Sequence, residues 1–276
     1  MAEITAVKRE KQAAIVHDWQ NKWALEGSCG PRNAGMGYWD ELKRHYNALA
    51  REGIAVEFVD QNADLTGYGL VVVPMLYLLT DAFAKKLCAF AQNGGTVIVT
   101  YWSGVVDESD LCRLGDTPYG LTELLGLRRT EIDGMYDGET RRCMPVAGCT
   151  LPAAQASTLC EVAALDVENP AEPLSLYDED YFAGHPAVAV HRYGKGCAYY
   201  LASRFDEAFY RAFYHDAAKE IGLSPAWPEA LPEGILAVRR GSFVFVQNCT
   251  EQPATVGNTV LERYRTAVWK GKDRIF

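Results

Sequence analysis

The sequence predicts an α/β protein, with an open, mostly parallel sheet followed by a small antiparallel β domain. Three observations support this prediction. Over the first two-thirds of the 276 residues, short apolar runs alternate with helical patterns. Two of the runs, VVVP at 71–74 and TVIVTY at 96–101, lack polar alternation, which is typical of strands that crossover helices cover on both faces. Beyond residue 234, short and partly alternating strands lie between turn residues, as in an antiparallel module.

The first elements alternate between strand and helix. Strands are expected at residues 13–19, 55–60, 70–76 and 96–101. A helix is expected over residues 38–52, because apolar side chains recur at spacings of three and four and Gly53 can end it. Its predicted inner face consists of Trp39, Leu42, Tyr46 and Leu49.

The second helix is expected over residues 81–93, with Thr80 or Asp81 as its N-cap and Gly94 and Gly95 after it. Its predicted inner face consists of Phe83, Leu87 and Phe90. A short helix follows at 121–126, whereas residues 128–173 show no clear pattern. Segments 187–192 and 197–202 flank Tyr-Gly-Lys-Gly and predict a hairpin. A last helix should begin after Asp206 and reach about residue 221.

Three prolines within residues 224–234 mark a domain boundary. The predicted organisation is a linker at 1–12, an α/β domain at 13–223 and a small β domain at 224–276. The strands expected in the last part are 235–239, 243–247, 254–256, 259–263 and 266–269. A module of this size is small for independent stability, so we expect it to pack on the larger domain.

Composition excludes several classes of function. The net charge of −9 opposes a nucleic-acid role, because phosphate contacts need a basic surface. The charged N-terminus lacks the apolar region of a signal peptide, and no apolar run reaches ~18 residues, so we expect a cytoplasmic protein without a membrane partner. The eight cysteines include no C-x-x-C pair. We therefore expect reduced thiols, no metal site and no cofactor.

The search for chemistry finds no complete catalytic pattern. The glycine-rich segment 27–37 lacks both nucleotide-binding motifs, and a mobile or interface loop is the better interpretation. Ser103 lacks the G-x-S-x-G frame of a hydrolase, and Cys29 follows no strand. A small amidotransferase-like hydrolase that uses Ser103 or Cys29 with His17 as the base stays open as an alternative. The acidic residues 107, 108 and 110 lie beside apolar ones, which suits an interface.

Four segments occur in an order that resembles one known domain. They are HDWQNKWAL at 17–25, VVPMLYLL at 72–79, TYWSGVVDE at 100–108 and RYGKG at 192–196. Together they resemble the trimerisation domain of family 42 glycoside hydrolases, the bacterial β-galactosidases, over about residues 12–223, and the tail resembles the family's small C-terminal β domain. The resemblance implies a fold like that of class I glutamine amidotransferases, with flavodoxin-like topology, but without the nucleophile.

The resemblance also implies what this chain lacks. In the family a (β/α)₈ barrel precedes this domain and carries the two catalytic carboxylates of a retaining glycosidase, and such a barrel needs ~250 residues. No catalytic residue can therefore be assigned to any position here, and His17 departs from the apolar residue usual in the family. The implied role is assembly of a β-galactosidase as a homotrimer, or with a separately encoded barrel.

Candidate interface residues follow from this role, since exposed aromatic side chains tend to anchor interfaces. They are Trp19, Trp23, Tyr77, Trp102 and Val105. A sugar-binding α/β module, with a galactoside over the strand ends near Trp19 and Trp102, is a second alternative.

Overall fold

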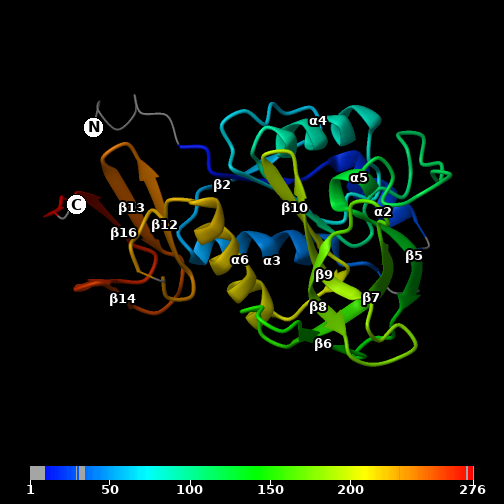
Figure 1. Ribbon diagram of the computed structural model, residues 1–276. Coiled ribbons are helices and arrows are strands. Elements are labelled where there is room, and N and C mark those ends of the chain that lie inside the picture. Colours follow the sequence, from blue (N-terminus) through cyan, green and yellow to red (C-terminus); the bar gives the residue numbers. More distant parts are fainter. Residues whose placement is uncertain (1–9, 29, 31–34, 230, 272, 276) are drawn as a thin grey trace.

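The computed structural model describes residues 10–28, 30, 35–229, 231–271 and 273–275. Its main feature is an eleven-stranded mixed sheet with the strand order β11-β7-β6-β8-β9-β10-β4-β3-β1-β2, in which β5 also pairs with β7. A four-stranded sheet and a two-stranded ribbon lie toward the C-terminus. Figure 1 shows the small sheet at one end of the molecule, beside α3 and α6. Among the described helices, none is long and apolar enough to cross a membrane.

The parallel half of the main sheet contains the strands that the sequence predicts most clearly. Its members run in the order β2-β1-β3-β4-β10, with every neighbouring pair parallel. All residues of β1, β3 and β4 are buried, as expected for unbroken apolar runs between helices. The strands are β1 (Ala13–Val16), β2 (Val56–Val59), β3 (Leu70–Val73), β4 (Thr96–Thr100) and β10 (Gly196–Leu201).

The antiparallel half is formed largely by the segment that the sequence left unassigned. Strand β10 pairs antiparallel with β9, and the antiparallel pairing continues through β8, β6, β7 and β11. Register shifts interrupt the β8–β9 and β5–β7 pairs, which breaks the regular alternation of inward and outward residues. The strands are β5 (Leu127–Gly134), β6 (Arg141–Pro145), β7 (Ala154–Leu165), β8 (Glu172–Tyr177), β9 (Pro186–Tyr193) and β11 (Ser203–Arg204).

Helices cover the parallel half from both sides. In Figure 1, α4 lies on the opposite side from α3 and α6, which pack against each other. Thr80 caps α4 by accepting a hydrogen bond from the Phe83 amide, and Asp206 caps α6 in the same way. The helices are α2 (Trp19–Gly27), α3 (Tyr38–Arg51), α4 (Asp81–Gln92), α5 (Thr122–Leu125) and α6 (Glu207–Ile221).

Two predictions about the first 50 residues are wrong. Strand β1 ends at Val16, and Trp19 begins α2 instead, because the Asp18 carboxylate accepts hydrogen bonds from the amides of the next turn. Trp39 is 43% exposed and does not belong to the inner face of α3. Glu41 and His45 are fully buried there, and a pattern of apolar residues cannot place two ionisable side chains on the inside of a helix.

The small sheet has its own hydrophobic cluster, which includes Ile235, Val246 and Trp269. Two kinds of polar contact join it to the rest of the chain. Arg51 of α3 pairs with Glu233 at 3.1 Å, and the Ala226 amide donates a hydrogen bond to the carbonyl of Gly53 at 2.7 Å. Its elements are β12 (Ile235–Arg240), β13 (Phe243–Asn248), β16 (Thr266–Lys270) and β17 (Asp273–Arg274), with β14 (Ala254–Val256) and β15 (Thr259–Leu261) as the ribbon.

Candidate functional site

The chain turns sharply after β3, with Met75 in the left-handed region at φ 43°. A hydrolase uses a strained turn of this kind to present its nucleophile, while free backbone amides hold the oxyanion. Here the side chain is a buried methionine. Thr100 Oγ1 accepts a hydrogen bond from the Met75 amide at 2.8 Å, and Ser103 Oγ accepts from the Leu76 amide at 3.0 Å. The turn therefore has neither a nucleophile nor a free amide at these two positions.

Ser103 and His17, the two described residues of the hydrolase alternative, do not form a catalytic pair. Ser103 is fully buried, and its hydroxyl is the acceptor for the Leu76 amide. The ring of His17 stacks on Trp39 with 4.9 Å between centroids, and no described contact joins it to Ser103. Cys29 lies outside the described residues. The geometry thus gives no support to a Ser103–His17 pair.

Three of the candidate interface residues lie beneath the loops that follow β3 and β4. Tyr77 and Trp102 are 8% and 7% exposed, and their rings stack with 5.7 Å between centroids. Val105 is half-buried beside them. Trp102 adopts φ 58°, and its amide donates to Glu161 Oε1 at 3.0 Å. These side chains fix the shape of the loops, and little of their own surface reaches solvent.

The buried carboxylate of Glu161 supports this loop from β7. Its Oε1 also accepts from Arg129 Nη1 at 2.7 Å, and its Oε2 accepts from the Tyr200 hydroxyl. Burial raises the pKa of Tyr200 well above its ordinary value, and the Glu161 charge adds to the effect, so the phenol stays a donor. Three donors thus bind the two oxygens of this carboxylate, and its bond to the Trp102 amide supports the left-handed conformation of that residue.

The acidic cluster at 107–110 is a turn. Asp107 accepts hydrogen bonds from the amides of Leu111 and Ser109, and these bonds lower the pKa of its carboxyl group. Glu108 lies 3.5 Å from Arg113, which pairs more closely with Asp81 at 2.7 Å. Within the described part of the chain, no group of three or more His, Cys, Asp or Glu side chains is placed to hold a metal ion.

Trp19, Trp23 and Trp39, together with His17, form an exposed aromatic surface beyond the end of β1, called here the tryptophan surface. The three indoles are 54%, 62% and 43% exposed. Their centroids are 6.2 Å apart for Trp19 and Trp23, and 6.0 Å apart for Trp19 and Trp39. Burial lowers the pKa of His17, and its buried Nε2 has no described hydrogen-bond partner. Contiguous exposed aromatic side chains of this kind mark interaction sites.

The sequence pointed to Trp19 and Trp23 but not to Trp39, which it placed in the core. The sequence feature that indicates exposure of Trp39 is its position at the second residue of a helix, directly after the glycine-rich segment. Residues 29 and 31–34 of that segment lie outside the described residues, so the predicted interface loop at 27–37 stays a prediction.

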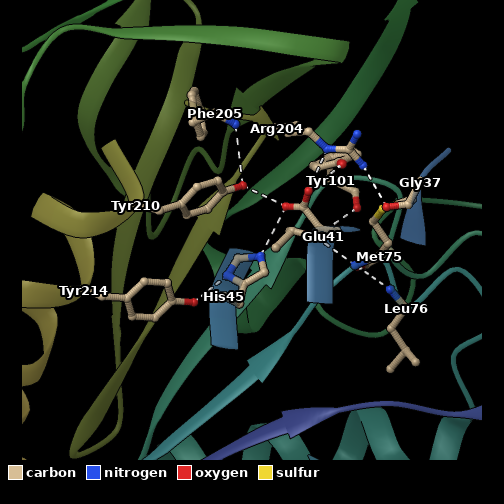
Figure 2. A network of polar contacts seen from close by, with 12 residues as sticks. Gly37, Glu41, His45, Met75, Leu76, Tyr101, Arg204, Phe205, Tyr210 and Tyr214 are labelled. Carbon is tan, nitrogen blue, oxygen red and sulfur yellow. Dashed lines mark hydrogen bonds and ion pairs between the residues drawn. The ribbon is translucent and has the colours of Figure 1, made fainter. Parts of the chain in front are cut away.

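A second polar network lies inside the molecule, between α3, α6 and the end of β4 (Figure 2). Glu41 Oε2 accepts from Arg204 Nε at 2.7 Å and from the Tyr101 hydroxyl at 3.2 Å. Glu41 Oε1 accepts from the Tyr210 hydroxyl at 2.7 Å and lies 3.2 Å from His45 Nε2. This network was not predicted from the sequence, because Arg204 and Tyr210 are more than 150 residues from Glu41 in the chain.

Two opposing effects set the pKa of Glu41. Burial alone would raise it, but the hydrogen bond and charge of His45, with the Arg204 charge and the Tyr210 hydroxyl, lower the pKa to about 2. Both carboxylate oxygens are therefore occupied by groups of the chain itself. The network locks α3 against α6, and it leaves no free oxygen for a substrate.

Comparison with known proteins places this geometry in a family. Residues 11–224 match the model of the β-galactosidase trimerisation domain. The chain is 42% identical to the β-galactosidase BglY of Alicyclobacillus acidocaldarius over 263 residues, which is 93% of this chain but 38% of BglY. It is 34% identical to the β-galactosidase Pbg of Clostridium perfringens, with 92% of this chain and 37% of Pbg covered.

Solved structures of β-galactosidases also superpose on this chain. The β-galactosidase from Rahnella sp. R3 superposes with a TM-score of 0.89 at 38% identity, over 97% of this chain and 42% of that one. Gan42B, described as a GH42 β-galactosidase, superposes with a TM-score of 0.84 at 29% identity, over 95% of this chain and 40% of that one. This chain thus spans about two-fifths of the length of these relatives, and it belongs to the β-galactosidase trimerisation domain family.

Proposed function

We propose that this chain is the non-catalytic part of a β-galactosidase that holds its subunits together as a homotrimer. The observation that carries the proposal is the tryptophan surface, in which three indoles of a trimerisation-domain family member are about half exposed. The surrounding enzyme would act on galactosides in the cytoplasm, through a barrel that precedes this chain or is encoded separately.

The tryptophan surface has the chemistry of a protein interface. Tryptophan is among the residues that dominate binding energies at interfaces, where truncating such an anchor to alanine costs about 2 kcal/mol or more. The indoles already touch one another, so they lose little side-chain freedom when a partner covers them. Trp19 and Trp23 are the proposed direct contacts. Tyr77, Trp102 and Val105 are proposed to shape the adjoining loop surface from beneath.

Self-association is tested by analytical ultracentrifugation of the chain over a concentration series up to tens of micromolar. We expect a trimer that the double substitution Trp19→Ala and Trp23→Ala converts to monomer. Tyr264→Ala is the matched control, because Tyr264 is also an exposed aromatic residue, 60% accessible, but belongs to the small C-terminal part. A wild-type chain that stays monomeric throughout the series would refute the proposal.

We also propose a flavodoxin-like topology for the parallel half. Its strand order, β2-β1-β3-β4-β10, follows the 2-1-3-4-5 pattern of that class when its strands are numbered in chain order. A division into domains at 13–223 and 224–276 is proposed too. It is supported by two separate hydrophobic clusters, one ending at Ala218 and one beginning at Ala226.

A second candidate function is sugar binding on the tryptophan surface. It is favoured by the exposed indole faces and by the buried Nε2 of His17, which has no described partner. Calorimetric titration with galactose and with lactose tests it. Absence of heat with both sugars would remove this candidate, whereas heat that is lost in Trp19→Ala would support it.

A further inference from the structure

A cavity of about 440 Å³ lies between α3, α6 and the start of the small sheet. One wall comes from α3, a second from the first turns of α6, and the third from the segment that leads into β12. Its apolar lining includes Ala48, Ala50 and Leu236. None of the residues of the tryptophan surface lines the cavity, and its size is that of a small-molecule site.

Most charges that line the cavity neutralise one another. Asp40 pairs with Lys43 at 3.3 Å. Arg51 pairs with Glu207 at 3.3 Å and with Glu233 at 3.1 Å. The three carboxylates of the lining are therefore all engaged by two of its cations.

Two arginines remain without an acidic partner. Within the part of the chain that the structure describes, no ion pair or side-chain hydrogen bond involves Arg44 or Arg211, and both line the cavity. Arg44 is half-buried, and its Nε has no accessible surface and no acceptor. A buried donor without an acceptor is costly, more so when it is charged. Arg44 thus has one unsatisfied donor, its Nε, which the chain itself covers, and it lines the cavity together with Arg211.

We propose that this cavity binds a small anion that carries a phosphate or carboxylate group, with Arg44 as its main ligand and Arg211 as the second. The planar guanidinium fork matches the oxygens of either group, and such charge-assisted bonds are among the strongest polar contacts in proteins. The volume leaves room for an organic body attached to the anionic group. Because one wall belongs to the segment before β12, the bound anion would tie the small sheet to α3 and α6.

Calorimetric titration of the 276-residue chain with inorganic phosphate, at constant ionic strength, tests the proposal. We expect saturable binding in the millimolar range, which Arg44→Gln weakens about tenfold, as the loss of one charge-assisted contact predicts. Arg211→Gln should weaken it less. The control is Arg192→Gln, which removes an exposed arginine that pairs with Glu220 away from the cavity. Citrate as a second titrant separates a phosphate site from a carboxylate site.

A second readout follows from the position of the cavity. Phosphate should slow amide hydrogen exchange in β12 but not in β5, which lies at the other end of the molecule (Figure 1). If Arg44→Gln does not fold, Arg44→Lys keeps the charge without the fork and should still weaken binding. Absence of phosphate and citrate binding by the wild-type chain, or equal binding by Arg44→Gln, would overturn the proposal.

Discussion

Substituting Glu41 by glutamine should lower the free energy of unfolding by about 3 kcal/mol. Glutamine keeps the size of the side chain but removes the charge that Arg204 and the two tyrosines contact. The carboxyl pKa falls from 4.5 to about 2 in the folded chain, and each pKa unit corresponds to about 1.4 kcal/mol. Removing one partner of a buried ion pair costs about 3 to 5 kcal/mol in general, so both routes lead to a similar value.

The pH dependence gives an independent check. A carboxyl group with a lowered folded-state pKa stabilises the fold above its unfolded pKa, and this stability is lost as the pH falls toward the folded value. For Glu41 the window runs from about pH 4.5 down to about pH 2. At pH 3.5 the wild-type chain should already have lost about 1.4 kcal/mol of this contribution. The difference in unfolding free energy between wild type and Glu41→Gln should therefore be smaller at pH 3.5 than at pH 7 by that amount.

Urea denaturation followed by tryptophan fluorescence measures both effects, provided that the slope of the transition is the same in both proteins. Glu220→Gln is the control, because it removes a partly exposed carboxylate that pairs with Arg192 at 2.8 Å. Such surface pairs contribute about 1 kcal/mol at most. Two results would show that the network is not a charged one. The first is a loss of unfolding free energy below about 1 kcal/mol in Glu41→Gln at pH 7. The second is a difference in unfolding free energy between wild type and Glu41→Gln that is as large at pH 3.5 as at pH 7.

Three further predictions concern other parts of the fold. Glu161→Gln should lower the free energy of unfolding by about 3 kcal/mol. It should also make Trp102 more accessible to acrylamide, because the carboxylate that holds the Trp102 amide is lost. Unchanged acrylamide quenching of tryptophan fluorescence would contradict this prediction. Gly196→Ala should lower the melting temperature strongly, because the added Cβ would lie 2.1 Å from the carbonyl oxygen of Gly95. Gly27→Ala is the control: its added Cβ meets nothing within 4 Å, so the melting temperature should not change. Ser103→Ala should cost about 1 kcal/mol of stability, as the acceptor for the Leu76 amide is lost. It should leave any background hydrolysis of p-nitrophenyl acetate unchanged, and a loss of hydrolysis would restore the hydrolase hypothesis.

Patterns that depend on neighbours in the chain were readable from the sequence. The apolar runs at β1, β3 and β4, the Thr80 and Asp206 caps and the hairpin of β9 and β10 all rest on local rules, and all are present. Helix α2 was missed because its residues carry almost no amphipathic pattern, and its start depends on one cap, Asp18. The α/β fold with a small antiparallel sheet is confirmed, and the sequence did not predict the antiparallel extension of the large sheet.

The candidate site was readable only in part. Trp19 and Trp23 were named as candidates from the family resemblance and their aromatic type, and both are exposed; their place at an interface stays a prediction. The loop at Trp102 is held by Glu161, which is about 60 residues further along the chain and accepts a hydrogen bond from the Trp102 amide. The Glu41 network joins residues more than 150 positions apart. No local pattern encodes contacts of that kind, because they arise only when the sheet has formed.

The pairing of β10 with β4 has a consequence for synthesis of the chain. Residues 96–100 find their parallel partner at residues 197–201, so the buried strand β4 has an unpaired edge until the ribosome has passed residue 201. An apolar edge of this kind recruits other strands, and pairing over such a long separation forms slowly. Chains that stop before residue 196 should therefore aggregate, whereas chains that stop after α6 retain a completed sheet.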